Sequence, residues 1–236
     1  MEESKREELE LLPAEAIIER ILAENKGKPC ITCSFQAGGM IVLDMLRRRI
    51  PNIPVLFVDT GYHFEEIYTF RDEIAKRWNL NLVNLAPQTT VTEQEDALGP
   101  LNKTDPDRCC RLRKVEPLSR GLQKYDVWFT GLRRSQSSTR AGIRVAEDHY
   151  LPSGKKLLKV NLIAGWNENQ VWRYTLEQEI EYLSLYNKGY TSIGCKPCTS
   201  LPVTRADARS GRWGGKKMEC GIHILTSDND GERCPC

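Results

Sequence analysis

Pro29-Cys30-Ile31-Thr32-Cys33-Ser34-Phe35-Gln36-Ala37-Gly38-Gly39 is the part of this 236-residue chain that indicates its fold class most directly. Residues 29–35 are typical of a buried strand, residues 36–39 form a glycine turn, and the apolar residues 40–46 predict a helix. This order builds a phosphate-binding geometry, because the first N–H groups of the helix point at the ligand. An ordinary strand-to-helix turn can look the same, since the stretch lacks the Walker lysine and the GxGxxG spacing.

The alternation of strands and helices continues on both sides of this stretch. Residues 14–25 carry an apolar stripe that predicts a helix, and residues 54–58 and 80–85 predict two strands separated by another amphipathic helix. The pattern predicts an α/β fold with a doubly wound, mostly parallel sheet. Ligands of such sheets bind beyond the carboxyl ends of the strands, which is where Ser34 and Asp59 fall.

Two arginines follow another predicted strand in the second half of the chain. Residues 125–130 predict this strand, and Arg133-Arg134 lie just beyond its end, where they could bind phosphate or sulfate oxygens. A solvated charged face is the alternative interpretation. A helix is predicted after Asn167, and from residue 199 onward the sequence is basic and glycine-rich without clear periodicity.

The composition is that of an ordinary globular chain. The formal net charge is +2 and the apolar fraction is 40%, so we expect one compact domain with appendages and no nucleic-acid partner. The strongly charged N-terminus and the lack of a long apolar run predict no secretory leader and no membrane span, which indicates the cytoplasm. In a reducing compartment, cysteines serve metal binding or catalysis more often than disulfides.

Four of the nine cysteines form two close pairs, Cys109-Cys110 and Cys195 with Cys198. Four thiolates brought together by folding make a metal or iron–sulfur site. A structural zinc module is the alternative. Adjacent cysteines fit a zinc hairpin poorly, because such sites usually place two to four residues between their ligands.

The first cysteine pair is expected at the start of a helix that Asp105-Pro106 caps. Free N–H groups at that position should favour thiolate over thiol, and Lys114 should place a cation on the same face as Cys110. Pro117 is expected to end or bend this helix.

Cys220 stands apart from the two pairs, beside His223 and downstream of Arg209 and Arg212. This setting is typical of a nucleophile rather than a ligand, because nearby cations increase the thiolate fraction of a cysteine. A structural histidine and a solvated basic face are the alternative interpretations of its neighbours.

The remaining cysteines have simpler interpretations. Cys30 and Cys33 lie in the first predicted strand, where they should act as small apolar residues. Cys234 and Cys236 lie at the C-terminal end, as stray thiols, a redox pair or accessory metal ligands.

Taken together, these motifs resemble the assimilatory adenylyl-sulfate reductases, the iron–sulfur branch of the phosphoadenylyl-sulfate reductase family. The resemblance covers roughly residues 28–223. It rests on six segments, Ser34 to Gly39, Asp59 to Gly61, Cys109 to Lys114, Gly131 to Gln136, Gly189 to Cys198 and Glu219 to His223. It implies an adenine-nucleotide alpha-hydrolase-like (PP-loop) fold.

The resemblance also implies the reaction, which is reduction of adenosine 5′-phosphosulfate to sulfite and AMP. Cys220 would attack the sulfur and form an S-sulfocysteine, which thioredoxin or a similar dithiol protein would reduce. A [4Fe–4S] cluster would be bound by Cys109, Cys110, Cys195 and Cys198. The role we expect for it is electrostatic and structural, with direct electron transfer as the alternative.

The substrate-binding residues are inferred from the same resemblance. Ser34 with its turn, Phe35 and Gln36, and nearby Asp59, should form the adenosine site. The phosphosulfate should contact a set of basic residues, Lys114, Arg209 and Arg212, with Arg134, Arg140 and His223 as further candidates.

One segment departs from the family pattern. Many cluster-bearing relatives have acidic residues at the last two positions of the turn, where this chain has Gly38-Gly39. The departure affects nucleotide selectivity, so a 3′-phosphoadenylyl-sulfate reductase or a dual-specificity enzyme is an alternative. A PP-loop ATP pyrophosphatase acting in thiolation is an alternative of a different class, although its SGGxDS-like loop is missing.

The resemblance divides the chain into an N-terminal helical segment (1–27), a nucleotide-binding and iron–sulfur reductase domain (28–198) and a mobile catalytic tail (199–236). Glycines before Cys220 predict hinge freedom, so the last 25 or so residues should close over substrate and open for thioredoxin. The sequence does not determine the oligomeric state, and a homo-oligomer is compatible with it.

Overall fold

The computed structural model describes residues 1–204, 208–215, 217 and 219–223. Within them, one sheet of six strands has the order β3-β2-β1-β4-β6-β5. The strands are β1 (Pro29–Thr32), β2 (Pro54–Val58), β3 (Asn81–Leu85), β4 (Val127–Thr130), β5 (Ala146–Tyr150) and β6 (Lys156–Asn161). All neighbouring pairs are parallel except β5 with β6, so the predicted α/β fold with a mostly parallel sheet is confirmed.

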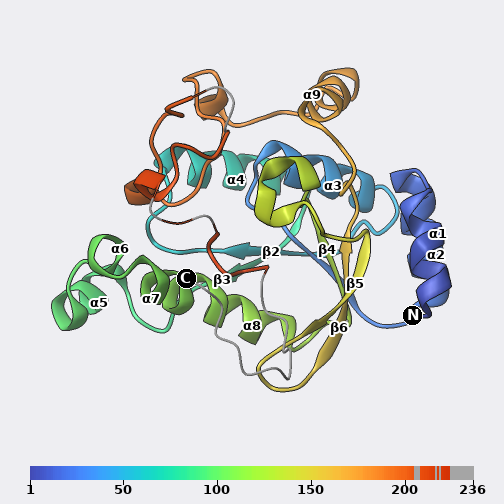
Figure 1. Ribbon diagram of the computed structural model, residues 1–236, viewed down its shortest axis with the longest axis horizontal. Helices are drawn as coiled ribbons and strands as arrows, with labels where there is room; N and C mark the ends of the chain where they lie inside the picture. The colour runs from blue at the N-terminus through green and yellow to red at the C-terminus, as the bar shows by residue number, and fades with distance from the viewer. Residues whose placement is uncertain (205–207, 216, 218, 224–236) are drawn as a thin grey trace.

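Helices cover both faces of the sheet, in three layers (Figure 1). The longer helices are α1 (Glu3–Glu10), α2 (Ala14–Glu24), α3 (Ala37–Arg47), α4 (Glu65–Arg77), α5 (Val91–Leu98), α8 (Glu116–Leu122) and α9 (Glu168–Glu177). The short helices α6 (Leu101–Thr104) and α7 (Pro106–Cys110) precede α8. In Figure 1, α3 and α4 lie above the sheet, and α7 and α8 lie below it. No helix of the described residues is long and apolar enough to cross a bilayer.

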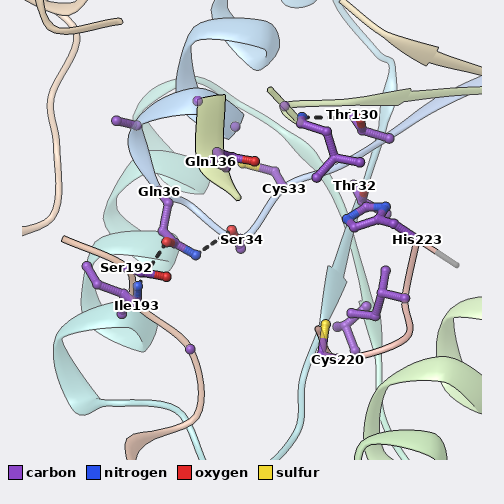
Figure 2. Close-up of a pocket in the computed structure, with 18 of the residues that line it drawn as sticks. Thr32, Cys33, Ser34, Gln36, Thr130, Gln136, Ser192, Ile193, Cys220 and His223 are labelled. Carbon is purple, nitrogen blue, oxygen red and sulfur yellow. Dashed lines mark hydrogen bonds between the residues drawn. The ribbon is translucent and has the colours of Figure 1, made fainter. Parts of the chain in front are cut away.

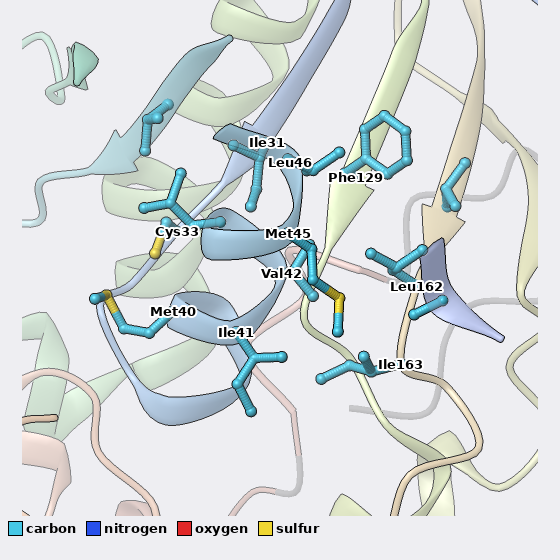
Figure 3. Close-up of a cluster of buried hydrophobic side chains, with 14 of the residues drawn as sticks. Ile31, Cys33, Met40, Ile41, Val42, Met45, Leu46, Phe129, Leu162 and Ile163 are labelled. Carbon is cyan, nitrogen blue, oxygen red and sulfur yellow. The ribbon is translucent and has the colours of Figure 1, made fainter. Parts of the chain in front are cut away.

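Among the described residues, one apolar cluster lies on each face of the sheet, and a third, small one contains Cys195, Cys198 and Trp213. Ile31 of β1 belongs to the larger cluster with α3, and Figure 3 shows it beside Leu46 and Phe129. Cys30 belongs to the smaller cluster on the α8 face, because successive side chains of a strand point to opposite faces. Cys30 and Cys33 are both buried, and burial raises the pKa of Cys33 to about 12. Their expected role as small apolar residues is confirmed.

The first strand is shorter than the sequence indicates, since β1 ends at Thr32 rather than at Phe35. Phe35 has a φ of 57°, in the left-handed region that a bulky side chain rarely adopts. Its ring is fully buried and packs edge-on against Phe57 and Phe70. Burial of this ring compensates for the unfavourable backbone, which turns the chain from β1 toward α3.

The helix that contains the cysteine pair also differs from expectation. Cys109 and Cys110 form the last two residues of α7, not its start, and the Cys109 N–H donates to Asp105 O at 3.0 Å. The chain then continues as a π-helix over Arg111–Val115 and runs directly into α8. Pro117 does not end the helix, because the first turn of α8 tolerates a residue without an N–H group.

The antiparallel edge of the sheet was not predicted. β5 and β6 form a hairpin whose turn contains Gly154 at a φ of 81°. Short polar strands such as Ala146–Tyr150 carry little apolar periodicity, and their pairing depends on the neighbouring β4.

Candidate active site

A cavity of about 260 Å³ lies beyond the carboxyl ends of β1 and β4. These strands are neighbours in the sheet but distant in sequence, and β2 lies on the other side of β1. The cavity therefore opens at the switch point of the sheet, where ligands of such folds bind. Figure 2 shows Ser34 and Gln36 on one side of it and Cys220 and His223 on the other.

Two glycines bring the loops after β1 and β4 into direct contact. A Cβ atom on Gly131 would lie 2.7 Å from the carbonyl carbon and oxygen of Gly38, and one on Gly38 would lie 3.0 Å from Gly131 O. Neither position accepts a side chain without movement of backbone. The first turn of α3 is thereby held at the wall of the cavity.

Gln36 connects two segments that line the cavity, the turn after β1 and the 191–194 loop. Its Nε2 donates to Ser34 Oγ at 3.0 Å, and its Oε1 accepts a hydrogen bond from the N–H of Ile193 at 3.2 Å (Figure 2). Ser34 and Gln36, two of the predicted adenosine contacts, thus line the cavity, and the 191–194 loop completes that wall.

Phe35 and Asp59, two predicted adenosine contacts, do not line the cavity. The Phe35 ring is in the core, as described above. Asp59 Oδ1 accepts from Tyr68 Oη at 2.7 Å and from the Gly61 N–H at 3.0 Å, and its Oδ2 accepts from Asn84 at 3.2 Å. The side chains of Phe35 and Asp59 are engaged outside the cavity. The two residues therefore fix the loops around the site and do not face a ligand.

The adjacent arginines after β4 point in different directions. Arg134 donates to Ile143 O at 2.8 Å and to Glu10 at 2.6 Å, away from the cavity, so its predicted anion contact is not supported. Arg133 lines the cavity, is 93% buried and donates from Nη2 to Glu168 at 2.7 Å. Its Nε and Nη1 have no partner within the described part of the chain. A buried guanidinium with two unused donors is suited to an anion.

The C-terminal segment forms the opposite wall of the cavity, with a buried tryptophan at its centre. Trp213 is 93% buried and packs against Cys195 and Cys198. Four cations lie within 6 Å of its ring, and the shortest separation, 4.4 Å, belongs to Arg212. These cations are Lys114, Arg209, Arg212 and Lys217. The four cations repel one another, and their attraction to the face of the indole ring offsets this repulsion.

Arg212 reaches its position because residue 194 is glycine. A Cβ atom there would lie 2.1 Å from Nη2 of Arg212. The Arg212 Nε donates to Cys198 O at 3.2 Å, so this guanidinium also braces the second cysteine pair. The cavity is lined by four of the residues predicted to contact the phosphosulfate, Lys114, Arg140, Arg209 and Arg212.

Lys114 connects Cys220 with the two cysteine pairs electrostatically. Burial by itself would lower the pKa of Lys114, but the neighbouring sulfurs of Cys195, Cys220 and Cys110 raise it above its ordinary value, so the amine stays charged. Burial by itself would raise the pKa of Cys220. Lys114, a hydrogen bond from the Ile222 backbone and Arg140 together hold the Cys220 pKa below its usual value. Cys220 therefore has the properties of an activated thiol.

His223 lines the cavity but is not a cation. Burial, with Lys159 and Arg140 nearby, lowers the pKa of His223 well below its ordinary value. The imidazole stacks on Trp128, with 5.5 Å between ring centroids and 16° between planes. The expectation that His223 contributes positive charge to Cys220 is therefore wrong, because a buried ring between cations stays neutral.

The four paired cysteines are brought together by folding. Cys109, Cys110, Cys195 and Cys198 are all buried and line one small pocket with Tyr62 and Lys114. Thr60, in the loop after β2, contacts the Cys195 sulfur at 3.3 Å, and Tyr62 O accepts a hydrogen bond from the Lys196 N–H at 2.7 Å. The second pair is thus attached to the sheet through the Asp59 to Tyr62 loop.

The free thiols of Cys109 and Cys110 are not activated, contrary to the expectation from a helix start. Burial and the neighbouring sulfurs raise the pKa of Cys109 to about 12, and burial also raises the pKa of Cys110 and Cys198. Four thiolates side by side require a positive partner. Among the described residues, no group of three or more His, Cys, Asp or Glu side chains is arranged to hold a single metal ion.

The fold and the cavity define a class, the α/β proteins whose parallel sheet binds a ligand at its switch point. A family model for the phosphoadenosine phosphosulfate reductase domain matches residues 28–201. The chain belongs to the phosphoadenosine phosphosulfate reductase family.

Three comparisons describe its position. The chain is 42% identical to the adenosine 5′-phosphosulfate reductase of Mycobacterium tuberculosis. The match extends over 198 residues, which cover 81% of this chain and 77% of the relative. The phosphate complex of phosphoadenylyl-sulfate reductase from Candida auris matches with a TM-score of 0.71 and 24% identity, covering 83% of this chain and 96% of that one. FMN adenylyltransferase from Candida glabrata matches with a TM-score of 0.63 and 13% identity, over 85% and 67%. The last two similarities establish the fold alone.

Three residues at the site were not singled out from sequence. They are Trp213, Glu219 and Arg133, which the sequence did not distinguish from Arg134. Their side chains are buried or ion-paired beside the cavity. A tryptophan within a basic, glycine-rich segment was the one available signal for Trp213. Nothing in sequence spacing distinguishes Arg133 from Arg134. Cys234 and Cys236 lie outside the described residues.

Proposed function

We propose that this chain reduces adenosine 5′-phosphosulfate to sulfite and AMP through an S-sulfo adduct of Cys220, with thioredoxin or a similar dithiol protein as reductant. The observation that carries the proposal is an activated thiol facing a cavity lined by Lys114, Arg209 and Arg212. The relatives named adenosine 5′-phosphosulfate reductase, at up to 42% identity, support the same reaction.

The first chemical step is nucleophilic attack by the Cys220 thiolate on the sulfur of the phosphosulfate. A bond forms between the Cys220 Sγ and this sulfur, and the bond from sulfur to the bridging oxygen breaks. AMP leaves with that electron pair. Lys114, Arg209 and Arg212 stabilise the charge that develops on the bridging oxygen, because fixed cations in a buried site need no reorganisation.

The second step restores the enzyme. One thiolate of the dithiol protein attacks the Cys220 Sγ, sulfite leaves, and the mixed disulfide is resolved by the second thiol of the same protein. The dithiol supplies both electrons and ends as a disulfide. For this exchange Cys220 must become accessible, so the tail (199–236) must open between the two steps. We treat this tail as a unit separate from residues 1–27 and 28–198.

The four paired cysteines fit a [4Fe–4S] cluster. Each thiolate of such a cluster binds its own iron, so the sulfurs need not converge on one point, and the iron ions supply the positive partner that these buried thiolates require. When bound, the cluster supplies a fixed charge distribution beside the site. Lys114, whose charge balances the thiolates of both Cys110 and Cys220, orients the anionic end of the substrate.

A second candidate substrate is the 3′-phosphorylated nucleotide, used instead of or beside adenosine 5′-phosphosulfate. Gly38-Gly39 presents no carboxylate to the cavity, and Arg133 offers two unused donors there. An added phosphate would meet Arg133 and helix N–H groups at this wall, where the Glu168 carboxylate that pairs with Arg133 also lines the cavity. The same features support dual specificity as the second candidate.

The test uses anaerobically purified protein with reduced thioredoxin and each of the two substrates. We expect sulfite release with adenosine 5′-phosphosulfate, and a loss of roughly a thousandfold or more in the Cys220→Ser variant, with iron content and AMP binding retained. Nucleotide-dependent sulfite release that persists in Cys220→Ser would reject the mechanism. Release of pyrophosphate from ATP would point to the PP-loop pyrophosphatase alternative instead. We place the reaction in the cytoplasm, where reduced dithiol proteins are found.

A further inference from the structure

The carboxylate of Glu219, the residue before Cys220, is enclosed by donors from the loop that follows β4. Arg140 donates from Nε to Oε1 at 2.9 Å and from Nη2 to Oε2 at 2.7 Å. The hydroxyls of Ser137 and Thr139 lie 3.1 and 2.9 Å from the same Oε1. Arg209 lies 3.5 Å from Oε2. We refer to Ser137, Thr139, Arg140 and Arg209 as the Glu219 socket.

The contact between Glu219 and the socket is buried and geometrically fixed, unlike a surface ion pair. The side chains of Arg140 and Glu219 are 11% and 10% exposed, and their two parallel hydrogen bonds fix the relative orientation of both groups. Removing Arg140 leaves the buried Glu219 carboxylate with two hydroxyls and the more distant Arg209, and removing Glu219 leaves the buried Arg140 without an anionic partner, so either change disfavours the docked state.

Arg140 uses all three of its nitrogens within the protein while Glu219 is bound. Its third nitrogen, Nη1, donates to Gln136 Oε1, so each nitrogen of the guanidinium has an acceptor within the protein. Arg133 on the same cavity wall differs, because two of its nitrogens have no partner among the described residues. The two arginines therefore have different tasks in this closed arrangement.

The tail is held on the other side of Cys220 as well. Ile222 packs against the apolar cluster on the α8 face, and His223 stacks on Trp128 and offers its carbonyl to Lys159 Nζ at 3.3 Å. Cys220 lies between the two anchors. Fixing both flanks of a nucleophile holds its sulfur in one place, which is how orientation contributes to rate.

We propose that Glu219 is a positioning residue, whose carboxylate docks the tail in the socket and holds the Cys220 Sγ over the cavity. Arg140 then belongs to the socket and not to the set of substrate contacts. The catalytic consequence rests on the function proposed above. The docking itself does not, so the two can fail separately.

The test measures amide hydrogen exchange of residues 219–223 in the full chain without nucleotide, in Glu219→Gln, Arg140→Gln and the double variant. Each single change should speed exchange tenfold or more, and the double variant should be no faster than the faster single, because both remove one shared interaction. Glu181→Gln, which breaks an exposed pair with Arg77 far along the chain, is the matched control and should exchange like the parent.

Two kinetic readouts separate positioning from substrate contact. The single-turnover rate of Cys220 S-sulfonation should fall tenfold or more in both single variants. The dissociation constant of adenosine 5′-phosphosulfate, measured in a Cys220→Ser background, should change less than twofold. Unchanged exchange in either variant overturns the proposal, as does a tenfold loss of affinity in Arg140→Gln. Faster exchange in a chain that forms no adduct leaves the socket standing and rejects the proposed function.

Discussion

His223 lies face to face with Trp128, with 5.5 Å between ring centroids and 16° between planes, so the end of the described tail rests on the central strand β4. His149 meets the same indole edge-on at 5.0 Å. The histidine of the Glu219 to His223 segment is thus a docking group, since it is buried, neutral and stacked.

Tail docking should weaken at acidic pH because of this contact. The docked pKa of His223 lies below the value of the exposed ring, so the docked state binds fewer protons. Docking is therefore complete above the exposed pKa of about 6.5 and is lost progressively as pH falls below it. Exchange of residues 219–223, corrected for its intrinsic pH dependence, should be faster at pH 5 than at pH 7.5.

His223→Phe is the control for this pH effect, because phenylalanine keeps a ring on Trp128 and has no proton to gain. Its exchange should be nearly independent of pH. Equal pH dependence in the parent and in His223→Phe would show that another group titrates. His149, Lys159, Glu147, Arg140 and Arg209 surround the docked end and would then be examined in turn.

Removing the charge of Lys114 should deactivate Cys220. Lys114 is the largest influence that lowers the Cys220 pKa, against burial that raises it. In Lys114→Met the thiolate fraction at pH 7 falls, so alkylation of Cys220 by iodoacetamide should slow roughly fivefold or more, and the midpoint of its pH profile should move upward. Quantifying the Cys220 peptide by mass spectrometry checks this.

Lys114→Arg keeps the charge and should retain most of the alkylation rate. If Lys114→Met and Lys114→Arg slow alkylation equally, then access to the sulfur, and not its ionisation, limits the reaction.

Trp213 should matter for both stability and anion binding. Trp213→Leu removes a buried indole, which costs about 3 kcal/mol of unfolding free energy, and it also separates the cations around the ring. We expect the dissociation constant for adenosine 5′-phosphosulfate to rise about tenfold. Denaturant unfolding and nucleotide binding measure the two effects.

Trp213→Phe keeps an aromatic face at the same place and should recover most of the affinity despite a smaller ring. A Trp213→Leu protein that binds substrate as tightly as the parent would mean that the cations hold their positions without the indole.

Iron content should depend on the two cysteine pairs and not on the other buried cysteines. Cys195→Ser, at the residue that contacts Thr60, should lose most of the roughly four irons per chain and its visible absorption. Cys30→Ala, in the apolar cluster on the α8 face, should keep both. Loss of iron in Cys30→Ala with an intact fold, or full iron in Cys195→Ser, would contradict the assignment of the cluster ligands.

The sequence predicted the fold class and the place of the cavity at the strand ends, and it singled out Cys220 and the two cysteine pairs as candidates for chemistry. These features are local, because apolar periodicity, a glycine turn and close cysteine spacing are properties of short segments. The second strand, Pro54–Val58, was predicted to the residue. The hairpin of β5 and β6 was missed, since its stability depends on pairing with β4 and not on its own pattern.

Only the three-dimensional packing decided which charged groups face the ligand. Arg133 and Arg134 are adjacent in sequence, yet one lines the cavity and the other pairs with Glu10 in the first helix. His223 became neutral and Arg140 became the partner of Glu219 for the same reason. Burial and distant partners set the charge and direction of a side chain, and both depend on contacts between segments that are far apart in the chain.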